Sequence, residues 1–356
     1  MYDNMTKFKK KYTIVRDKNL LHSVVLVDGQ AGCGKTLINS ITASMERVEL
    51  FNYSTELENL CILKELSKID DDAVQTMIKI QMDHVLYETM MSRRVNFRID
   101  DLSSAFKDVK VFTYIKRLFE KGDEIIPSRI KKNNPILHFA VHNLLPISKP
   151  VFLSLQKKLK FIEVIRHPLY MIIQQTLNHI NISKNNGSAR QFRIYLDCNN
   201  KKIPFTSKAF HQKYFFLKPV ERAILEMENF YNLANRFKKE NSNLIKNLIT
   251  IPFEDFVLNP EIYIKKISKL LNTNISKKTK KVMIKQKIPR KKISDGIPLN
   301  IYKRCGWTPP VTGISEKEEL SIRRDFAIKQ KAKSYYIDIL DKLSDEYEKK
   351  YFKNII

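Results

Sequence analysis

The sequence predicts an α/β fold in which a central, mostly parallel sheet is flanked by helices. Short apolar segments typical of buried strands alternate along the chain with longer amphipathic segments typical of helices. The chain has 356 residues, of which 43% are hydrophobic, so it can form a substantial core and is not wholly disordered. Only eight residues are glycine, and three of them fall within residues 29–34. Such a cluster indicates a loop whose backbone adopts unusual conformations.

The predicted elements follow one another in a regular order. Strands are expected at 23–28, 48–53, 136–141, 161–165 and 248–253. Helices are expected at 36–47, 55–67, 71–93, 169–180 and 220–239. A further helix is expected to begin at Asn259-Pro260, where Asn caps the helix and Pro occupies its first turn.

The pattern divides the chain into three parts. Residues 1–20 form a basic N-terminal segment, residues 21–313 form the α/β domain, and residues 314–356 form a charged helical segment. Residues 181–217 are polar, carry an Asn-Asn-Gly turn signal and are interpreted as an insertion in the domain. No run approaches the roughly 18 apolar residues of a membrane span, and no signal peptide is evident.

The composition indicates an anionic partner. The formal net charge is +26, which favours nucleic acid, an acidic polymer or a multiply phosphorylated cofactor. The scattered lysines also agree with a bias in the base composition of the genome. The four cysteines, Cys33, Cys61, Cys198 and Cys305, lie far apart and lack metal-ligand spacing. We therefore expect no metal site and a reducing, cytoplasmic environment.

Residues 29–36 match the phosphate-loop pattern G-x-x-x-x-G-K-[ST] in full, between a predicted strand and a predicted helix. Glycines let successive backbone N–H groups surround an anion, and the helix N-terminus adds partial positive charge. Lys35 would supply a point charge, and Thr36 a hydroxyl for an oxygen or for Mg²⁺. The loop alone fits an ATP-dependent kinase or other nucleoside triphosphatase. Such enzymes place an Asp for Mg²⁺ after a second strand, where this chain has Arg166, which suits a phosphate.

Three segments, taken in order, resemble the PAPS-dependent sulfotransferases, which use 3′-phosphoadenosine 5′-phosphosulfate (PAPS). Residues 32–38, GCGKTLI, resemble the 5′-phosphosulfate loop of that family. Residues 160–172, KFIEVIRHPLYMI, resemble its 3′-phosphate segment, in which Arg-x-Pro follows a strand. Residues 250–271 resemble a later strand, Glu-Asp, Asn-Pro and helix segment. The resemblance spans about residues 20–310 and implies a P-loop NTPase-like sulfotransferase fold.

The resemblance also implies a set of cofactor-binding residues: Gly29, Gly32, Cys33, Gly34, Lys35, Thr36, Leu37, Arg166, Gln174, Arg290 and Lys291. The loop would hold the 5′-phosphosulfate, and the residues from Arg166 onward would hold the 3′-phosphate. The family usually has Arg or Lys at the place of Gly32 and Thr at the place of Lys35. Gln174 stands where a serine is common, and its amide still donates a hydrogen bond. Residues 289–296 resemble the family's Arg-Lys-Gly loop, and residues 302–307 compete for that role.

His142 is the candidate general base. It lies in Val-His-Asn-Leu-Leu-Pro at 141–146, which is similar to the His-Leu-Pro segment of cytosolic sulfotransferases. Many carbohydrate-acting members use a glutamate instead, and a structural histidine is the alternative interpretation. Lys35 is the second candidate catalytic residue, because its charge can stabilise the bridging oxygen as the sulfuryl group is transferred.

The sequence therefore predicts transfer of a sulfuryl group from PAPS to a hydroxyl or amine acceptor, without a metal ion. A basic surface favours acidic glycans as it favours many other anions, so small alcohols, amines, lipids and tyrosyl peptides stay open as acceptors. The insertion at 181–217 and the helical segment at 54–130 fall outside the cofactor segments, so we expect them on the acceptor side. An ATP-dependent P-loop kinase or NTPase is one alternative. A basic nucleic-acid-binding protein is another, but most aromatic residues lie in apolar, core-like stretches.

Overall fold

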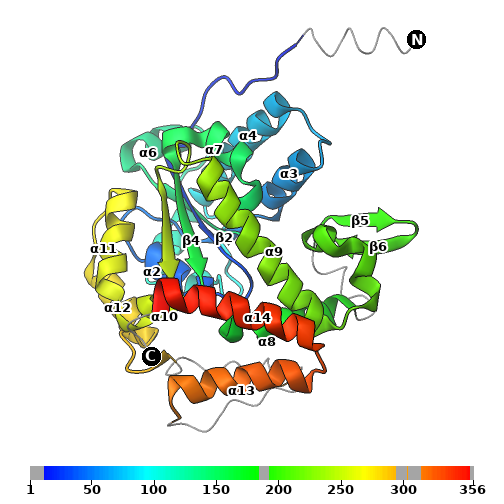
Figure 1. Ribbon diagram of the computed structural model, residues 1–356. Helices are drawn as coiled ribbons and strands as arrows, with labels where there is room; N and C mark the ends of the chain where they lie inside the picture. The colour runs from blue at the N-terminus through cyan, green and yellow to red at the C-terminus, as the bar shows by residue number, and fades with distance from the viewer. Residues whose placement is uncertain (1–11, 184–191, 294–302, 304–313, 353–356) are drawn as a thin grey trace, which may run out of the picture.

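A five-stranded parallel sheet forms the centre of the computed structural model (Figure 1), which describes residues 12–183, 192–293, 303 and 314–352. The strand order is β2-β3-β1-β4-β7. These strands are β1 Ser23–Asp28, β2 Asn52–Tyr53, β3 Ile136–Ala140, β4 Leu159–Ile165 and β7 Leu248–Pro252. Every pairing within this sheet is parallel. The predicted α/β class is therefore confirmed.

The central strand β1 is buried on both faces. Val24 and Leu26 point into one hydrophobic cluster, whereas Val25 and Val27 point into another. All four side chains are fully buried. This alternation explains why the strand is a continuous apolar run, as expected for a parallel sheet that is covered by helices on both sides.

Helices form the two layers that cover the sheet. The first cluster takes side chains from α2 Lys35–Ala43, α8 Pro168–Ser183, α10 Phe253–Leu258, α11 Pro260–Leu271, α12 Lys277–Lys285, α13 Glu316–Lys329 and α14 Ser334–Tyr347. The second takes side chains from α3 Thr55–Glu65, α4 Asp71–Thr89, α6 Ile125–Asn133 and α7 Lys149–Leu155. The long helix α9 Pro219–Glu240 contributes to both. None of the described helices combines the length and apolar character needed to cross a bilayer.

Some predicted boundaries differ from the structure. The expected strand at 48–53 is reduced to β2, because only Asn52 and Tyr53 pair continuously with β3. Val48 forms a single bridge to Ile136. The predicted insertion contains the antiparallel strands β5 Tyr195–Cys198 and β6 Lys201–Pro204, followed by a 3₁₀ segment, Phe205–Phe216. These short elements escaped the sequence analysis because their hydrophobic periodicity is weak.

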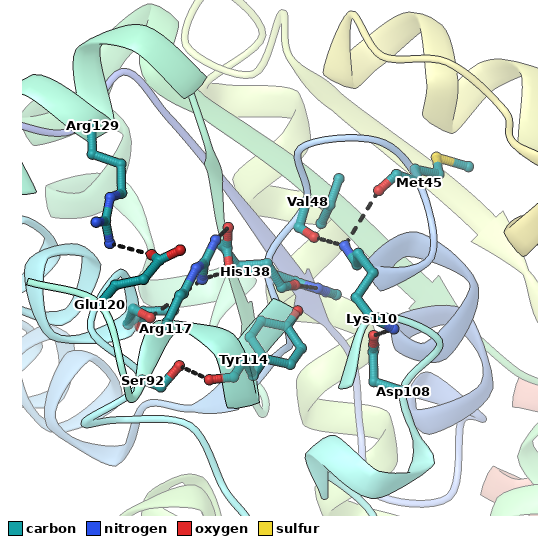
Figure 2. A network of polar contacts seen from close by, with 12 residues as sticks. Met45, Val48, Ser92, Asp108, Lys110, Tyr114, Arg117, Glu120, Arg129 and His138 are labelled. Carbon is teal, nitrogen blue, oxygen red and sulfur yellow. Dashed lines mark hydrogen bonds and ion pairs between the residues drawn. The ribbon is translucent and has the colours of Figure 1, made fainter. Parts of the chain in front are cut away.

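Buried polar contacts hold the chain around α5 Val111–Arg117 against residues 48–49, which lead into the edge strand β2 (Figure 2). Arg117 donates to both carboxylate oxygens of Glu49, at 2.7 and 2.9 Å. Lys110 donates to the carbonyl of Val48. His138 is fully buried, and burial lowers its pKa to about 3. Its neutral ring contacts the Asn39 side chain and the Glu49 carbonyl, so it is part of the core.

The helical C-terminal extension is confirmed and packs on the domain. Helix α14 crosses α8 and α9, and α13 lies beside α8 (Figure 1). Tyr347 of α14 donates 2.6 Å to the buried Glu254, which follows β7. The extension therefore reaches the segments that leave the carboxyl edge of the sheet.

Candidate functional site

The candidate site lies at the carboxyl edge of the sheet. The phosphate loop follows the central strand β1, and the neighbouring strands β3 and β4 lead to His142 and Arg166. Strand β7, at the edge of the sheet, leads to Phe253. Because the strands are parallel, these segments leave the sheet on the same side, where open α/β sheets bind ligands.

The backbone of the phosphate loop requires glycine. Gly34 has φ 93°, and a Cβ on it would lie 2.1 Å from the Phe253 ring. Gly32 has φ 89°, and a Cβ there would lie 2.9 Å from the Cβ of Gln174. The loop is thus enclosed between Phe253 and α8, and its left-handed residues turn the chain directly into α2. The glycine cluster in the sequence reflects this close packing.

The side chain of Lys35 folds back into the phosphate loop that precedes it. Its ammonium donates to the Gly29 carbonyl and lies 3.4 Å from the Gln30 carbonyl. The residue is only 8% exposed. The ammonium therefore places a desolvated positive charge within the phosphate loop, where it would attract a bound anion more strongly than a charge in water does. Thr36 and Leu37 follow in the first turn of α2.

Asp28, which the sequence analysis missed, joins the phosphate loop to the chain after β3. Its two carboxylate oxygens accept the backbone N–H groups of Leu144 and Leu145, at 3.1 and 2.7 Å. Burial raises the pKa of Asp28 to about 6, although the Lys35 charge and the backbone hydrogen bonds oppose the rise. The sequence signal for this role was an acidic residue at the end of an apolar strand.

Arg166 contacts the phosphate loop directly. Its Nη1 donates 2.8 Å to the Gly32 carbonyl, and its Nε lies 3.5 Å from the carboxylate of Glu254. The guanidinium carbon lies 4.5 Å from the centre of the Phe253 ring. Gln174, eight residues later, packs against Gly32 and donates to Asn178. The buried Glu254 is thus the carboxylate partner of this arginine.

The other predicted cations divide into two groups. Arg290 faces the same Phe253 ring as Arg166, with its guanidinium carbon 5.7 Å from the ring centre. Its backbone N–H donates to Val257, which fixes the start of this loop beside α10. Lys291 is exposed, and its cofactor role stays a prediction. The competing segment at 302–307, apart from Lys303, lies outside the described residues.

His142 is held by Glu58 of α3. One Glu58 carboxylate oxygen accepts the backbone N–H of His142 at 2.8 Å and lies 3.2 Å from its Nδ1. The imidazole stacks on Tyr53 at 5.8 Å and keeps 43% of its side-chain surface accessible. A carboxylate at Nδ1 favours the proton on that nitrogen and leaves Nε2 as the basic one. This is the arrangement that a general base requires.

The pKa of His142 is held below its usual range. Surrounding protein desolvates the ring, and the charges of Lys35 and Arg193 oppose its protonation, while Glu58 favours it. The ring is therefore mainly neutral near pH 7 and able to accept a proton. The two candidate catalytic residues come from neighbouring strands, since the loop after β1 carries Lys35 and His142 follows β3.

We expect Glu58→Gln to lower the pKa of His142 further, because the substitution removes the carboxylate that stabilises the imidazolium. An NMR titration of the histidine ring would measure this shift without depending on activity. Glu56→Gln is a matched control, since Glu56 is an exposed residue of the same helix. An unchanged or raised pKa in Glu58→Gln would contradict the assigned contact.

The predicted insertion approaches the same site. Asn59 of α3, next to Glu58, donates to the Phe192 carbonyl at 3.4 Å. The positive charge of Arg193 contributes to the lowered pKa of His142. Phe192 is 74% exposed. The start of the described insertion therefore brings an exposed aromatic residue and a cation to α3, the helix that holds the candidate base.

No family model and no curated protein sequence matches the chain. Solved structures similar to it include the sulfotransferase domain of the Synechococcus PCC 7002 olefin synthase, at 11% identity and TM-score 0.38, covering 89% of this chain and 98% of that one. The sulfotransferase domain of the curacin biosynthetic pathway matches at 11% identity and TM-score 0.41, covering 88% of this chain and 99% of that one. Sulfotransferase STF9 from Mycobacterium avium matches at 10% identity and TM-score 0.37, covering 91% of this chain and 80% of that one. These similarities are distant, and function has to be inferred from the residues of the site.

Proposed function

We propose that this protein is a PAPS-dependent sulfotransferase that transfers a sulfuryl group to a hydroxyl or amine acceptor. One observation carries the proposal: a single edge of the sheet combines a phosphate loop, an arginine that contacts this loop, and an accessible histidine. Lys35 lies in the loop, Arg166 bonds to the loop at Gly32, and His142 follows the adjacent strand. The reaction requires a site for the phosphosulfate, a cation for the second phosphate and a proton acceptor, and these three groups would supply them.

The residues present fit a cofactor with two separated anionic groups. The glycine backbone of the loop, with Lys35 and the N-terminus of α2, suits the 5′-phosphosulfate. Arg166 and Arg290, which share the Phe253 ring, suit the 3′-phosphate. Gln174 packs against Gly32, whose carbonyl accepts a hydrogen bond from Arg166. The proposed sites are thus neighbours, as the dimensions of one nucleotide require.

Each residue then has a defined task. When bound, PAPS supplies the sulfuryl group, whose bond to the bridging oxygen breaks as a bond to the acceptor oxygen or nitrogen forms. Nε2 of His142 accepts the proton that the acceptor loses, and Glu58 holds the ring for this purpose. Lys35 stabilises the negative charge that develops on the bridging oxygen. Arg166 and the loop hold the reactants in line.

The acceptor is proposed to bind between α3 and the insertion. Tyr53 stacks on His142, the exposed Phe192 contacts α3, and the charge of Arg193 lowers the pKa of His142, so this part of the protein offers aromatic surface and positive charge. Together with the net charge of +26, this favours an acceptor that carries an anionic group, for which an acidic glycan is one class.

Adenosine 3′,5′-bisphosphate, the desulfonated cofactor, is expected to raise the unfolding temperature in the presence of EDTA. A ligand at 100 times its dissociation constant adds about 2.7 kcal/mol to the free energy of unfolding. The matched comparisons are adenosine 5′-monophosphate, ATP with Mg²⁺, and single-stranded nucleic acid. A shift seen only with ATP and Mg²⁺ would support a kinase or NTPase, and one seen only with nucleic acid would support a binding protein.

A further inference from the structure

Two arginines far apart in the sequence face one aromatic ring beside the phosphate loop. The guanidinium carbons of Arg166 and Arg323 lie 5.1 and 4.6 Å from the centre of the Tyr170 ring. Tyr170 belongs to α8, and its hydroxyl donates 2.6 Å to Glu316, in the first turn of α13. Helix α13 is thereby fixed next to α8 (Figure 1), with Arg323 directed to the same ring as Arg166.

The loop that carries Arg290 is tied to the same helix. The backbone N–H of Ile293 donates 2.8 Å to Glu316, and Lys292 donates 3.0 Å to the Ile314 carbonyl. Arg290 and Arg166 both face Phe253, whereas Arg166 and Arg323 both face Tyr170. Arg166 therefore shares one ring with each of the other two arginines, and the three come from three separate segments.

The charges of this cluster are largely removed from water. The side chains of Arg166 and Arg323 are 17% and 14% exposed. Arg323 donates to Glu319 from Nε and Nη2, at 2.9 and 2.6 Å. Burial lowers the pKa of Arg323, and the charge of Arg166 lowers it further, while Glu319 opposes both effects. Each guanidinium has a carboxylate partner, Glu254 for Arg166 and Glu319 for Arg323, and in such surroundings it still attracts a further anion more strongly than it would in water.

We infer that Arg323 is a third cation of the 3′-phosphate subsite, and that α13 is therefore part of the cofactor site. This inference rests on the proposed function. A guanidinium has five N–H donors, so Arg323 can serve both Glu319 and a phosphate oxygen. A phosphate dianion accepts several charge-assisted hydrogen bonds and matches the planar guanidinium well. The C-terminal segment thus contributes to nucleotide recognition as well as to packing.

The test is calorimetric binding of adenosine 3′,5′-bisphosphate and of adenosine 5′-monophosphate, which lacks the 3′-phosphate. Arg323→Gln is expected to weaken bisphosphate binding about 10- to 100-fold and to change monophosphate binding less than about threefold. Arg324→Gln is the control, because Arg324 pairs with Asp341 at the surface. Its affinities for both nucleotides are expected to match those of the unmodified protein.

A second variant separates binding from folding. Arg323→Gln leaves Glu319 without its cation, so Glu319→Gln/Arg323→Gln removes both charges together. The double variant is expected to show the same selective loss of bisphosphate affinity, with cooperative unfolding retained. Unchanged bisphosphate affinity in both variants, or equal losses for the two nucleotides, would overturn the role of Arg323. If the unmodified protein binds neither nucleotide, the proposed function itself is overturned.

Discussion

His142→Ala is expected to lower turnover about 10²- to 10⁴-fold, the usual contribution of a general base, with the affinity for adenosine 3′,5′-bisphosphate nearly unchanged. The selective loss follows from geometry. His142 follows β3 on one side of the phosphate loop, whereas Arg166, the first of the proposed 3′-phosphate residues, follows β4 on the other. Removing the imidazole removes the proton acceptor without disturbing the cations that hold the nucleotide. Single-turnover rates with excess enzyme, together with nucleotide titrations, would measure both quantities.

The control for this variant is His84→Ala. His84 is 63% exposed on α4 and pairs only loosely with Glu88, at 3.5 Å. Its replacement should leave both turnover and nucleotide affinity intact. The rate of the unmodified protein should also fall as the pH drops through the lowered pKa of His142, because protonation abolishes its basicity. A folded His142→Ala protein with nearly full activity would show that this histidine is structural.

Those parts of the fold that depend on local pattern could be predicted from the sequence. The strand β1 is a continuous apolar run because both of its faces are buried, and the glycine spacing of the loop directly reflects its left-handed residues. The strand at 48–53 was overestimated because its pairing partner, β3, accepts continuous pairing only from Asn52 and Tyr53. Such a limit is set by the neighbouring strand and leaves no signal in the segment itself.

The partners of the site residues could not be predicted, because they come from distant segments. Glu58 lies 84 residues before His142 and reaches it because α3 packs against the segment that follows β3. Arg323 lies far beyond Arg166, on a helix whose charged sequence is typical of a solvated surface. Asp28 carried a weak signal, since an acid ended an apolar strand, but the backbone N–H groups that donate to it follow a different strand. Residue types at the strand ends were thus predictable, whereas the contacts that orient them were not.

Lys35→Ala is expected to lower the single-turnover rate strongly and to raise the dissociation constant of the nucleotide only modestly. The ammonium is buried within the loop, held by the carbonyls of Gly29 and Gln30. From this position its charge gains most when the bridging oxygen becomes negative, because a desolvated charge interacts more strongly than one in water. An interaction that strengthens in the transition state appears in the rate more than in the affinity.

Lys35→Arg should restore little of this rate. The ammonium is buried and held by two loop carbonyls, so a larger planar guanidinium does not replace this compact point charge. The other interpretation is that Lys35 only holds the loop or neutralises bound phosphate. In that case Lys35→Ala would lose nucleotide affinity by a large factor and keep its single-turnover rate once saturated. Measuring both constants on the same variants decides between them, since a charge that acts on the bridging oxygen changes the rate even when every site is filled.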